Sequence, residues 1–510
     1  MIFFWALLNL PPSIRYNLCN IKLLALAKSS ITKSSAIELL QDFISSINKF
    51  PTAGLEVNHK GTKKKYFGDL AFALGDTLAL HWLGGFLEGV GTAIKFCRSC
   101  EITFNDRANE KIKEYEPREL GRHIEQLNLI KEAPDLIKTY GVKCESALLK
   151  INGFDVCSSL LQDPMHILIE GVCNLEVKAL LNYLIEDKGI SLSAINKRIC
   201  DFQYFILDRN DLPHNIQSKN LLKNAKLPMS AGQMMTLMHN LPFILGDLFV
   251  AYDKHWLNFL LLHKLFNLTF AYVYDERTVK ELKVTIELYL ENFIQLHKNE
   301  RITPKMHYLT HFPSQLENYG PLRHHTCFRF ESRIGLLKRF RFNNFINLAY
   351  SVSDKNQLWT ASKEKEFENK LSMNYLDDEC VIDLKDNIDD LFYDMLNYKK
   401  SIQLVKHFKK DGFQFYPDMF LILKNNFDAP DRSIGLIRKI INLDAGHFIF
   451  YVQYFKIEMK YPKENCFIIK HLEDFAFIDY DYLFHKHIQF AIKKEDKILI
   501  QIRYWHHLIT

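Results

Sequence analysis

The chain carries two short stretches of metal-binding residue types, Cys97-Arg98-Ser99-Cys100 and His307-Tyr308-Leu309-Thr310-His311. Structural Zn²⁺ sites take four nitrogen or sulfur ligands in a tetrahedron, and the two stretches together supply that number and type. Either pair alone is a weak signal, because two histidines on a helix usually serve packing or lie at the surface. In combination they predict a structural Zn²⁺ site that joins segments about 200 residues apart, with the ligands Cys97, Cys100, His307 and His311.

A carboxylate flanks each stretch at nearly the same distance. Asp76 lies 21 residues before Cys97, and Glu331 lies 20 residues after His311. Enzymes that break and join phosphodiesters with two metal ions need about three converging carboxylates. The mirrored spacing therefore predicts that Asp76 and Glu331 face each other across catalytic Mg²⁺, at the edge of one mixed sheet. The alternatives are a turn residue for Asp76 and, for Glu331, a surface charge paired with Arg333 or Lys338.

A third element is Asp163-Pro164-Met165-His166. Asp is a favoured N-cap residue and Pro a favoured first helical residue, so this stretch is typical of the start of a helix. The functional interpretation places Asp163 and His166 near the metal ions or the scissile phosphate. The residues alone leave both interpretations open.

Composition indicates an ordinary folded protein. The net charge is only +5 and 48% of the residues are hydrophobic, so DNA contact must come from local clusters such as Lys63-Lys64-Lys65 and Lys338-Arg339-Phe340-Arg341. Such clusters can equally be solvated faces. Ten irregularly spread cysteines favour reduced thiols in the cytosol or nucleus. The apolar start, ended by Pro11-Pro12, is too short for a membrane span and predicts an interior strand.

The pattern of apolar residues divides the chain into α/β, α and β regions. Strands are predicted at the start, near Ile21 to Ala27 and at Tyr66 to Gly75, with a helix from Ser34 to Ile47. Helical periodicity follows at Met165 to Ile185, Ser230 to Asn240, Trp256 to Tyr272, Val279 to His297 and Phe328 to Phe342. Short β-branched or aromatic runs occupy Phe413 to Leu423, Ser433 to Ile441, His447 to Phe455, Cys466 to Lys470 and Lys497 to Tyr504.

With these residues in view, residues 1–360 resemble CACTA-like (CMC group) DDE transposases, especially the animal branch. The early matching blocks are Asn9-Leu10-Pro11-Pro12, Gly75-Asp76-Thr77-Leu78-Ala79, Gly85-Phe86, the CxxC, Asp163-Pro164-Met165-His166 and Glu170-Gly171-Val172. The later blocks are Ser230-Ala231-Gly232-Gln233-Met234, Leu241-Pro242-Phe243, the stretch from Pro304 to Pro313, Gly320-Pro321-Leu322 and Arg329-Phe330-Glu331. The Cys and His flanks are also similar to those of Transib-type transposases and the vertebrate antigen-receptor recombinase.

The resemblance implies an RNase H-like catalytic core interrupted by a large all-α insertion, and the pattern of apolar residues adds a small β-rich C-terminal domain, so the predicted fold class is α/β. The predicted boundaries are 1–100 for the first part of the core, 101–315 for the insertion, 316–362 for the completing helix, 363–400 for a charged linker and 401–510 for a small β-barrel or sheet. A DDE triad with Mg²⁺ would nick transposon ends and join them to target DNA. Asp76 matches the second acidic residue, Glu331 the third, and Asp163 with His166 the D-x-x-H element. An alternative alignment makes Asp163 the second carboxylate, and Asp76 is preferred because it is expected to end a strand.

The chain departs from the family at its start. In relatives the first catalytic Asp lies on a strand upstream of the segment where this chain begins, and no Asp or Glu occurs here before Glu38. We therefore expect an N-terminally truncated, catalytically defective protein that acts in the nucleus, contacts DNA through Lys338, Arg339 and Arg341 and works as a homodimer, as relatives of this kind usually do. The alternative is a noncatalytic DNA- or chromatin-binding protein that keeps the same fold. DNA cleavage separates the two hypotheses.

Overall fold

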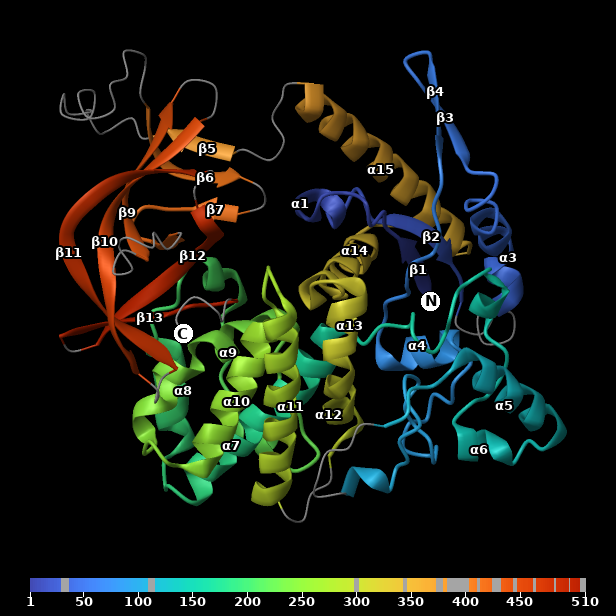
Figure 1. Cartoon of the computed structure of the whole chain (residues 1–510), viewed down its shortest axis with the longest axis horizontal. Helices are drawn as coiled ribbons and strands as arrows, with labels where there is room; N and C mark the ends of the chain where they lie inside the picture. The colour runs from blue at the N-terminus through green and yellow to red at the C-terminus, as the bar shows by residue number, and fades with distance from the viewer. Residues whose placement is uncertain are drawn as a thin grey trace.

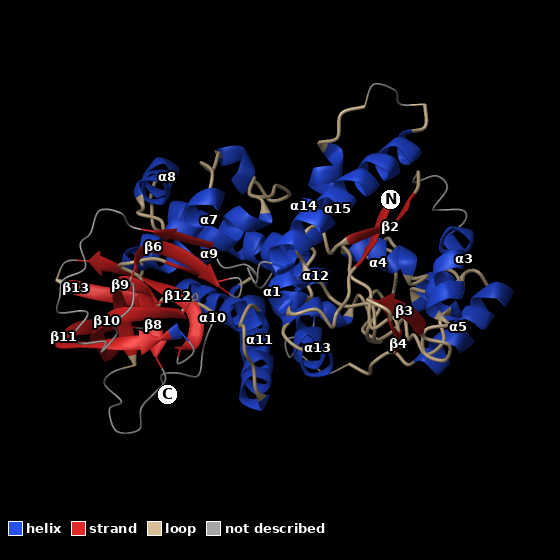
Figure 2. Ribbon diagram, turned by 90° about the horizontal axis from the view of Figure 1, so that it is seen from above, coloured by secondary structure: helices blue, strands red, loops and turns tan. Residues whose placement is uncertain are grey.

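The structure, a computed structural model, combines a helical body with a β domain formed by the C-terminal part of the chain (Figure 1). It describes residues 1–28, 36–108, 115–297, 302–342, 346–372, 379–382, 403–410, 413–423, 433–443, 447–461, 465–480, 483–494 and 496–504. Figure 2 shows the same division, with most strands gathered on one side of the molecule.

The N-terminal region begins with a two-stranded antiparallel sheet of β1 (Ile2–Trp5) and β2 (Lys22–Leu26). Both predicted strands are confirmed, but the interior position of the first is wrong, because among the described residues its sheet has two strands and Trp5 is 42% exposed. The short helix α1 (Pro12–Arg15) lies between them, and α3 (Ala36–Ile47) follows. A separate hairpin joins β3 (Leu55–His59) to β4 (Thr62–Tyr66).

The predicted strand from Tyr66 to Gly75 does not form, so Asp76 does not end a strand and no mixed sheet places it opposite Glu331. Tyr66 ends β4, and in the described stretch from there to Gly75 only Ala73 makes a bridge, parallel to Leu160. The carbonyl oxygens of Leu160 and Leu161 instead accept hydrogen bonds from the Arg98 guanidinium, and Leu161 O is the acceptor that the next step of the ladder would use. Asp76 instead caps helix α4 (Thr77–Leu83), and its Oδ1 accepts a hydrogen bond from the Ala79 amide at 2.7 Å.

Helices form the body of the molecule. They are α5 (Leu120–Glu132), α6 (Leu136–Tyr140), the π-helix η3 (Met165–Cys173), α7 (Asn174–Glu186), α8 (Leu192–Asp201), α9 (Ala231–Leu245), α10 (Lys254–Thr269), α11 (Glu276–Leu296), α12 (Pro304–Tyr308), α13 (Phe312–Tyr319), α14 (Phe328–Lys338) and α15 (Leu348–Ser372). Short 3-10 turns occur at Asp106–Ala108, Ala147–Lys150, Ile206–Asp211, Ser218–Leu221, Gly246–Leu248, Leu309–His311 and Leu322–His324. All five predicted helices after residue 101 are present, although the last ends at Lys338 rather than Phe342. Their assignment to an RNase H-like core or to an insertion stays a prediction.

The C-terminal region is antiparallel β structure, as predicted. Its strands are β5 (Glu379–Ile382), β6 (Gln403–Lys410), β7 (Phe413–Phe415), β8 (Phe420–Leu423), β9 (Ile434–Leu443), β10 (His447–Tyr461), β11 (Cys466–Asp479), β12 (Leu483–Lys494) and β13 (Lys497–Gln501). Hydrogen-bonded pairing closes a ring in the order β8, β9, β10, β11, β13, β12 and back to β8. Closure leaves no open edge within the ring, and the apolar side chains of Phe450, Val452 and Ile488 are buried. Much of the predicted 363–400 linker lies outside the described residues.

A buried polar contact joins this β region to the helices. Arg503 donates to both carboxylate oxygens of Asp208, at 2.9 and 2.8 Å, and to the Asn240 side chain at 3.1 Å. Next to it, Phe205 stacks on Phe490 with ring centroids 5.1 Å apart. These contacts fix the β region on α9 and on the turn before it. No described helix combines the length and apolar character needed to cross a bilayer.

Candidate metal centre and adjoining acidic cluster

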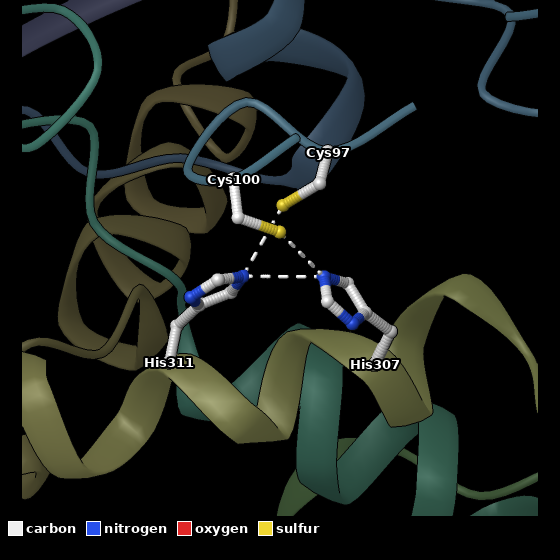
Figure 3. Close-up of side chains that lie close together, drawn as sticks. All are labelled: Cys97, Cys100, His307 and His311. Carbon is white, nitrogen blue, oxygen red and sulfur yellow. Dashed lines mark hydrogen bonds between the residues drawn. The ribbon is translucent and has the colours of Figure 1, made fainter. Parts of the chain in front are cut away.

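The four predicted Cys and His ligands converge on one point. Cys97 Sγ lies 3.2 Å from His311 Nε2, and Cys100 Sγ lies 3.3 Å from His307 Nε2. The two Nε2 atoms are 3.2 Å apart, and the four ligand atoms all lie within 4.8 Å of one another. Figure 3 shows the cysteines reaching from the loop after α4 and the histidines from consecutive helical turns toward the same space. The group can hold a metal ion.

Burial shapes the electrostatics of this Cys/His centre. It opposes ionisation of Cys97, but the hydrogen bond from Cys100 and the neighbouring His311 and His307 outweigh it and lower the pKa of the Cys97 thiol well below its usual value. Burial and the adjacent Cys97 raise the pKa of Cys100. Burial also lowers the pKa of His307, which favours the neutral imidazole that metal ions bind. A bound cation would favour the thiolate form of both cysteines.

Arg98, inside the CxxC, links this centre to the segment Leu160–Gln162. Its Nε donates to Leu160 O at 3.1 Å, and its Nη2 donates to Leu161 O at 2.9 Å and to Gln162 Oε1 at 2.7 Å. From the other side, Gln315 of α13 exchanges two hydrogen bonds with the Gln162 backbone, at 2.8 and 3.1 Å. The CxxC loop and helix α13, which begins directly after His311, thus hold the residues immediately before Asp163 from two sides.

Asp163, His166 and Glu331 form the core of an acidic cluster. His166 Nδ1 lies 2.5 Å from Asp163 Oδ2, and His166 Nε2 lies 3.1 Å from Glu331 Oε1. Asp163 is buried, and its Oδ1 accepts from the amides of Met165 and Cys327 at 3.0 and 3.3 Å. Burial opposes a charge on His166, but the hydrogen bonds with Asp163 and Glu331 outweigh it and raise the pKa of His166 to about 10. Asp163 thus fixes the ring that contacts Glu331, and it also serves as the helix start that the sequence allowed.

Asp76 approaches the same cluster from a parallel segment. The Ala73–Leu160 bridge is parallel, so Asp76 and Asp163 follow it in the same direction. Burial is the main cause of the raised pKa of Cys327, and Asp163, Glu331 and Asp76 all add to it. All three carboxylates therefore act electrostatically on the same thiol. Asp76 and Glu331 are exposed, whereas Asp163 belongs to a compact group with His166 and Cys327, whose ligand atoms lie within 4.8 Å of one another.

The ion pair considered between Glu331 and Arg333 does not form. Arg333 is fully buried and donates to Ile21 O at 3.3 Å and to Asn356 Oδ1 at 2.5 Å. Glu331 contacts His166 instead. The predicted DNA-contacting residues Lys338, Arg339 and Arg341 are exposed at and just beyond the end of α14.

Lys305 connects the acidic cluster to a pocket of about 470 Å³. Its Nζ donates to His166 O at 2.7 Å, and its chain passes over Gly171, where a Cβ atom would lie 2.4 Å from Lys305 Cδ. Burial and then the nearby Lys226 lower the pKa of Lys305. The charged residues that line this pocket are four lysines and two glutamates: Lys178, Lys223, Lys226, Lys305, Glu88 and Glu170.

Sequence reasoning missed Arg98, Lys305 and Cys327 as parts of the site. Arg98 and Lys305 lie inside the CxxC and the Pro304-to-Pro313 block, so their position next to ligand residues was the available signal. Cys327 stands alone in the sequence and offered none. No protein-family model matches the chain, and no curated protein matches it.

Proposed function

We propose that this chain derives from a DDE transposase and that it holds DNA at the acidic cluster without cutting it. The supporting observation is the shared scaffold of the two clusters. Arg98 and Gln315, which belong to the segments of the Cys/His centre, hold the residues leading to Asp163 and His166. A metal-dependent nuclease site needs carboxylates held in fixed positions. This scaffold fixes Asp163, which orients His166 and, through it, the exposed Glu331.

The ion proposed for the Cys/His centre is Zn²⁺. Zn–S bonds of about 2.3 Å and Zn–N bonds of about 2.0 Å give tetrahedral edges of roughly 3.3–3.8 Å between ligand atoms. The S–N separations of 3.2 and 3.3 Å and the N–N separation of 3.2 Å lie at or just below the short end of that range. All four tetrahedral positions are taken by protein ligands, which is typical of a structural rather than a catalytic zinc site.

The acidic cluster supports Mg²⁺ as the second ion. Asp76 and Glu331 are the exposed carboxylates that would hold it, and Mg²⁺ bound there would stabilise negative charge on phosphate oxygens. Both oxygens of Asp163 already accept or share hydrogen bonds, so Asp163 acts as a positioning residue. Two available carboxylates bind one ion weakly and do not support a two-metal displacement. We therefore expect DNA binding without cleavage.

Lys338, Arg339 and Arg341 supply the cationic contact to the DNA backbone. All three are exposed, next to the helix that carries Glu331, and none has an ion-pair partner among the described residues. Removing one phosphate-binding side chain should lower the salt dependence of duplex binding by about 0.9 in log–log slope. Alanine substitution of the three residues tests this by fluorescence anisotropy over a series of KCl concentrations.

Nicking of supercoiled plasmid in Mg²⁺ or Mn²⁺ tests the absence of cleavage. One break per plasmid is visible on a gel, and Glu331→Gln is the matched control because it keeps the side-chain shape. We expect equal, background nicking from both proteins. Robust nicking that Glu331→Gln abolishes would show a complete active site and overturn the inactive assignment.

The second candidate function is a noncatalytic DNA- or chromatin-binding protein that does not use the acidic cluster. The exposed basic residues after α14 favour it. The two candidates differ in the response of DNA binding to Mg²⁺. In the first, Mg²⁺ strengthens binding and Glu331→Gln removes that effect; in the second, neither change alters the affinity.

A further inference from the structure

The hairpin of β3 and β4 projects from the body of the molecule as an unsupported ribbon (Figure 1). It forms its own two-stranded sheet, and all ten strand residues are exposed. A free two-stranded ribbon is only marginally stable in water. Here a tight turn fixes it, with positive φ at Lys60 (50°) and at Gly61 (79°), the conformation that matches the twist of a hairpin.

The ribbon is strongly basic. Its twelve residues include four lysines, at positions 60, 63, 64 and 65, and one acidic residue, Glu56. Glu56 pairs with Lys63 at 2.8 Å, where both side chains are more than half exposed. Lys60 and Lys64 have no ion-pair partner in the described part of the chain. The positive charge is therefore neutralised only in small part by the protein itself.

The register distributes these lysines around the ribbon. Val57 pairs with Lys64 on one face, whereas Glu56 pairs with Lys65 on the other. Residues directly opposite in an antiparallel pair share a face and successive residues alternate, so lysines occupy both faces and Lys60 lies at the tip. A protein partner would cover one apolar face, but Lys64 interrupts the face that carries Leu55 and Val57. Charge on both faces instead suits a cleft with anionic groups on both walls.

We propose that this ribbon enters the major groove of duplex DNA, with its lysines contacting phosphates on both sides. The major groove is about 12 Å wide and admits a two-stranded ribbon, and phosphates line its two edges. The inference rests on the proposed DNA-binding function and adds a second contact, separate from the basic residues after α14. It assigns a role to Lys63, Lys64 and Lys65, which take no part in the function proposed for the acidic cluster.

The test compares two triple variants of equal charge. Lys60→Ala/Lys64→Ala/Lys65→Ala removes the ribbon's charge, and Lys197→Ala/Lys254→Ala/Lys280→Ala removes three exposed lysines elsewhere. With labelled duplex and a KCl series, the ribbon variant should show a log–log slope smaller by up to about 2.7, and the control variant should keep almost the full slope. Equal slopes for the two variants would overturn the proposal. Both proteins should keep the wild-type melting temperature, because every changed residue is exposed.

Two further measurements locate the contact. Guanine N7 faces the major groove, so wild-type protein should protect it from dimethyl sulfate and the ribbon variant should not. An unprotected N7 would overturn the groove assignment. Unchanged DNA binding together with a loss of dimers on sedimentation would instead make the ribbon a subunit contact and overturn the proposal. If the wild-type chain shows no salt-dependent DNA binding, both this inference and the proposed DNA binding are wrong. If the salt slope falls only in the variant with alanine at Lys338, Arg339 and Arg341, the proposed function stands and the role of the ribbon is wrong.

Discussion

The Cys/His centre and the acidic cluster are built from the same two parts of the chain, yet they differ in burial. Three of the four Cys/His residues are buried, and all four ligand atoms point at one another. In the acidic cluster Asp163 is buried, but Asp76 and Glu331 face solvent. Closed coordination contributes to folding, whereas exposed carboxylates leave room for a ligand. Under the proposed function, the first group stabilises the fold and the second group binds a ligand.

Removal of the metal centre should have the largest effect. Cys100→Ser, or zinc chelation of the wild type, should lower the free energy of unfolding by more than about 4 kcal/mol, because metal binding and folding are coupled. Urea unfolding and metal analysis of the purified protein measure this. Cys144→Ser is the control, since that cysteine is exposed and lies outside the centre. If metal-free protein unfolds like the wild type, the four residues stabilise the fold by side-chain packing alone, and the contrast between the two clusters is wrong.

Arg98→Met should remove the link between the Cys/His centre and the acidic cluster without changing any of the four Cys and His residues. It leaves the carbonyls of Leu160 and Leu161 without their donor, at a cost of about 2–4 kcal/mol. The zinc content should stay at the wild-type level, while the Mg²⁺ response of DNA binding disappears because Asp163 is no longer fixed. Exposed Arg122→Met should change neither. If Arg98→Met retains the Mg²⁺ response, the two clusters are independent.

The same contrast explains what the sequence could predict. A CxxC and an HxxxH are local patterns with one obvious chemistry, so the convergence of these four side chains was predicted correctly. The acidic cluster depends on distant contacts. Nothing near Asp76 in the sequence indicates that Arg98 will take the carbonyls that a strand from Tyr66 to Gly75 would need. Asp163 was ambiguous in the sequence because it is both a helix start and a member of the cluster.

In the fold, strongly patterned elements were predicted and weakly patterned ones were missed. Helix α11 has clear apolar periodicity, whereas α10 and β9 are long, mostly apolar segments that are largely buried. Strands β6 and β12 contain several Lys and His residues and lack the uniform β-branched character of their neighbours. Strand β12 closes the ring by pairing with β8 and β13, and β6 extends the sheet outside the ring by pairing with β9 and β5. No local pattern contains these distant pairings.

Gly171→Ala should have a smaller effect, confined to the acidic side. The new Cβ would lie 2.4 Å from Lys305 Cδ, so Lys305 must move away from His166 O. We expect a destabilisation of about 1–3 kcal/mol and weaker Mg²⁺-dependent DNA binding, with zinc retained. Gly121→Ala is the control, because a Cβ there meets nothing within 4 Å. Equal stability of the two variants would show that Lys305 adapts and that its position is not set by Gly171.

The smallest expected effect is a pH dependence of the unfolding free energy, caused by His166. It distinguishes the partly exposed acidic cluster from the buried Cys/His centre. The folded pKa of His166, about 10, lies above the ordinary value of 6.5, so the folded state binds the proton more tightly. The stability from its contacts with Asp163 and Glu331 is therefore fully present below about pH 6.5 and is lost as pH rises toward 10. Partial exposure limits the effect to about 1–2 kcal/mol. Without added Mg²⁺, the difference in unfolding free energy between wild type and His166→Gln should shrink steadily from pH 6 to pH 10. A constant difference in unfolding free energy would mean that His166 is neutral and that Asp163 only orients its ring. The acidic cluster would then carry less positive charge than these contacts imply, and it should bind Mg²⁺ more tightly than proposed.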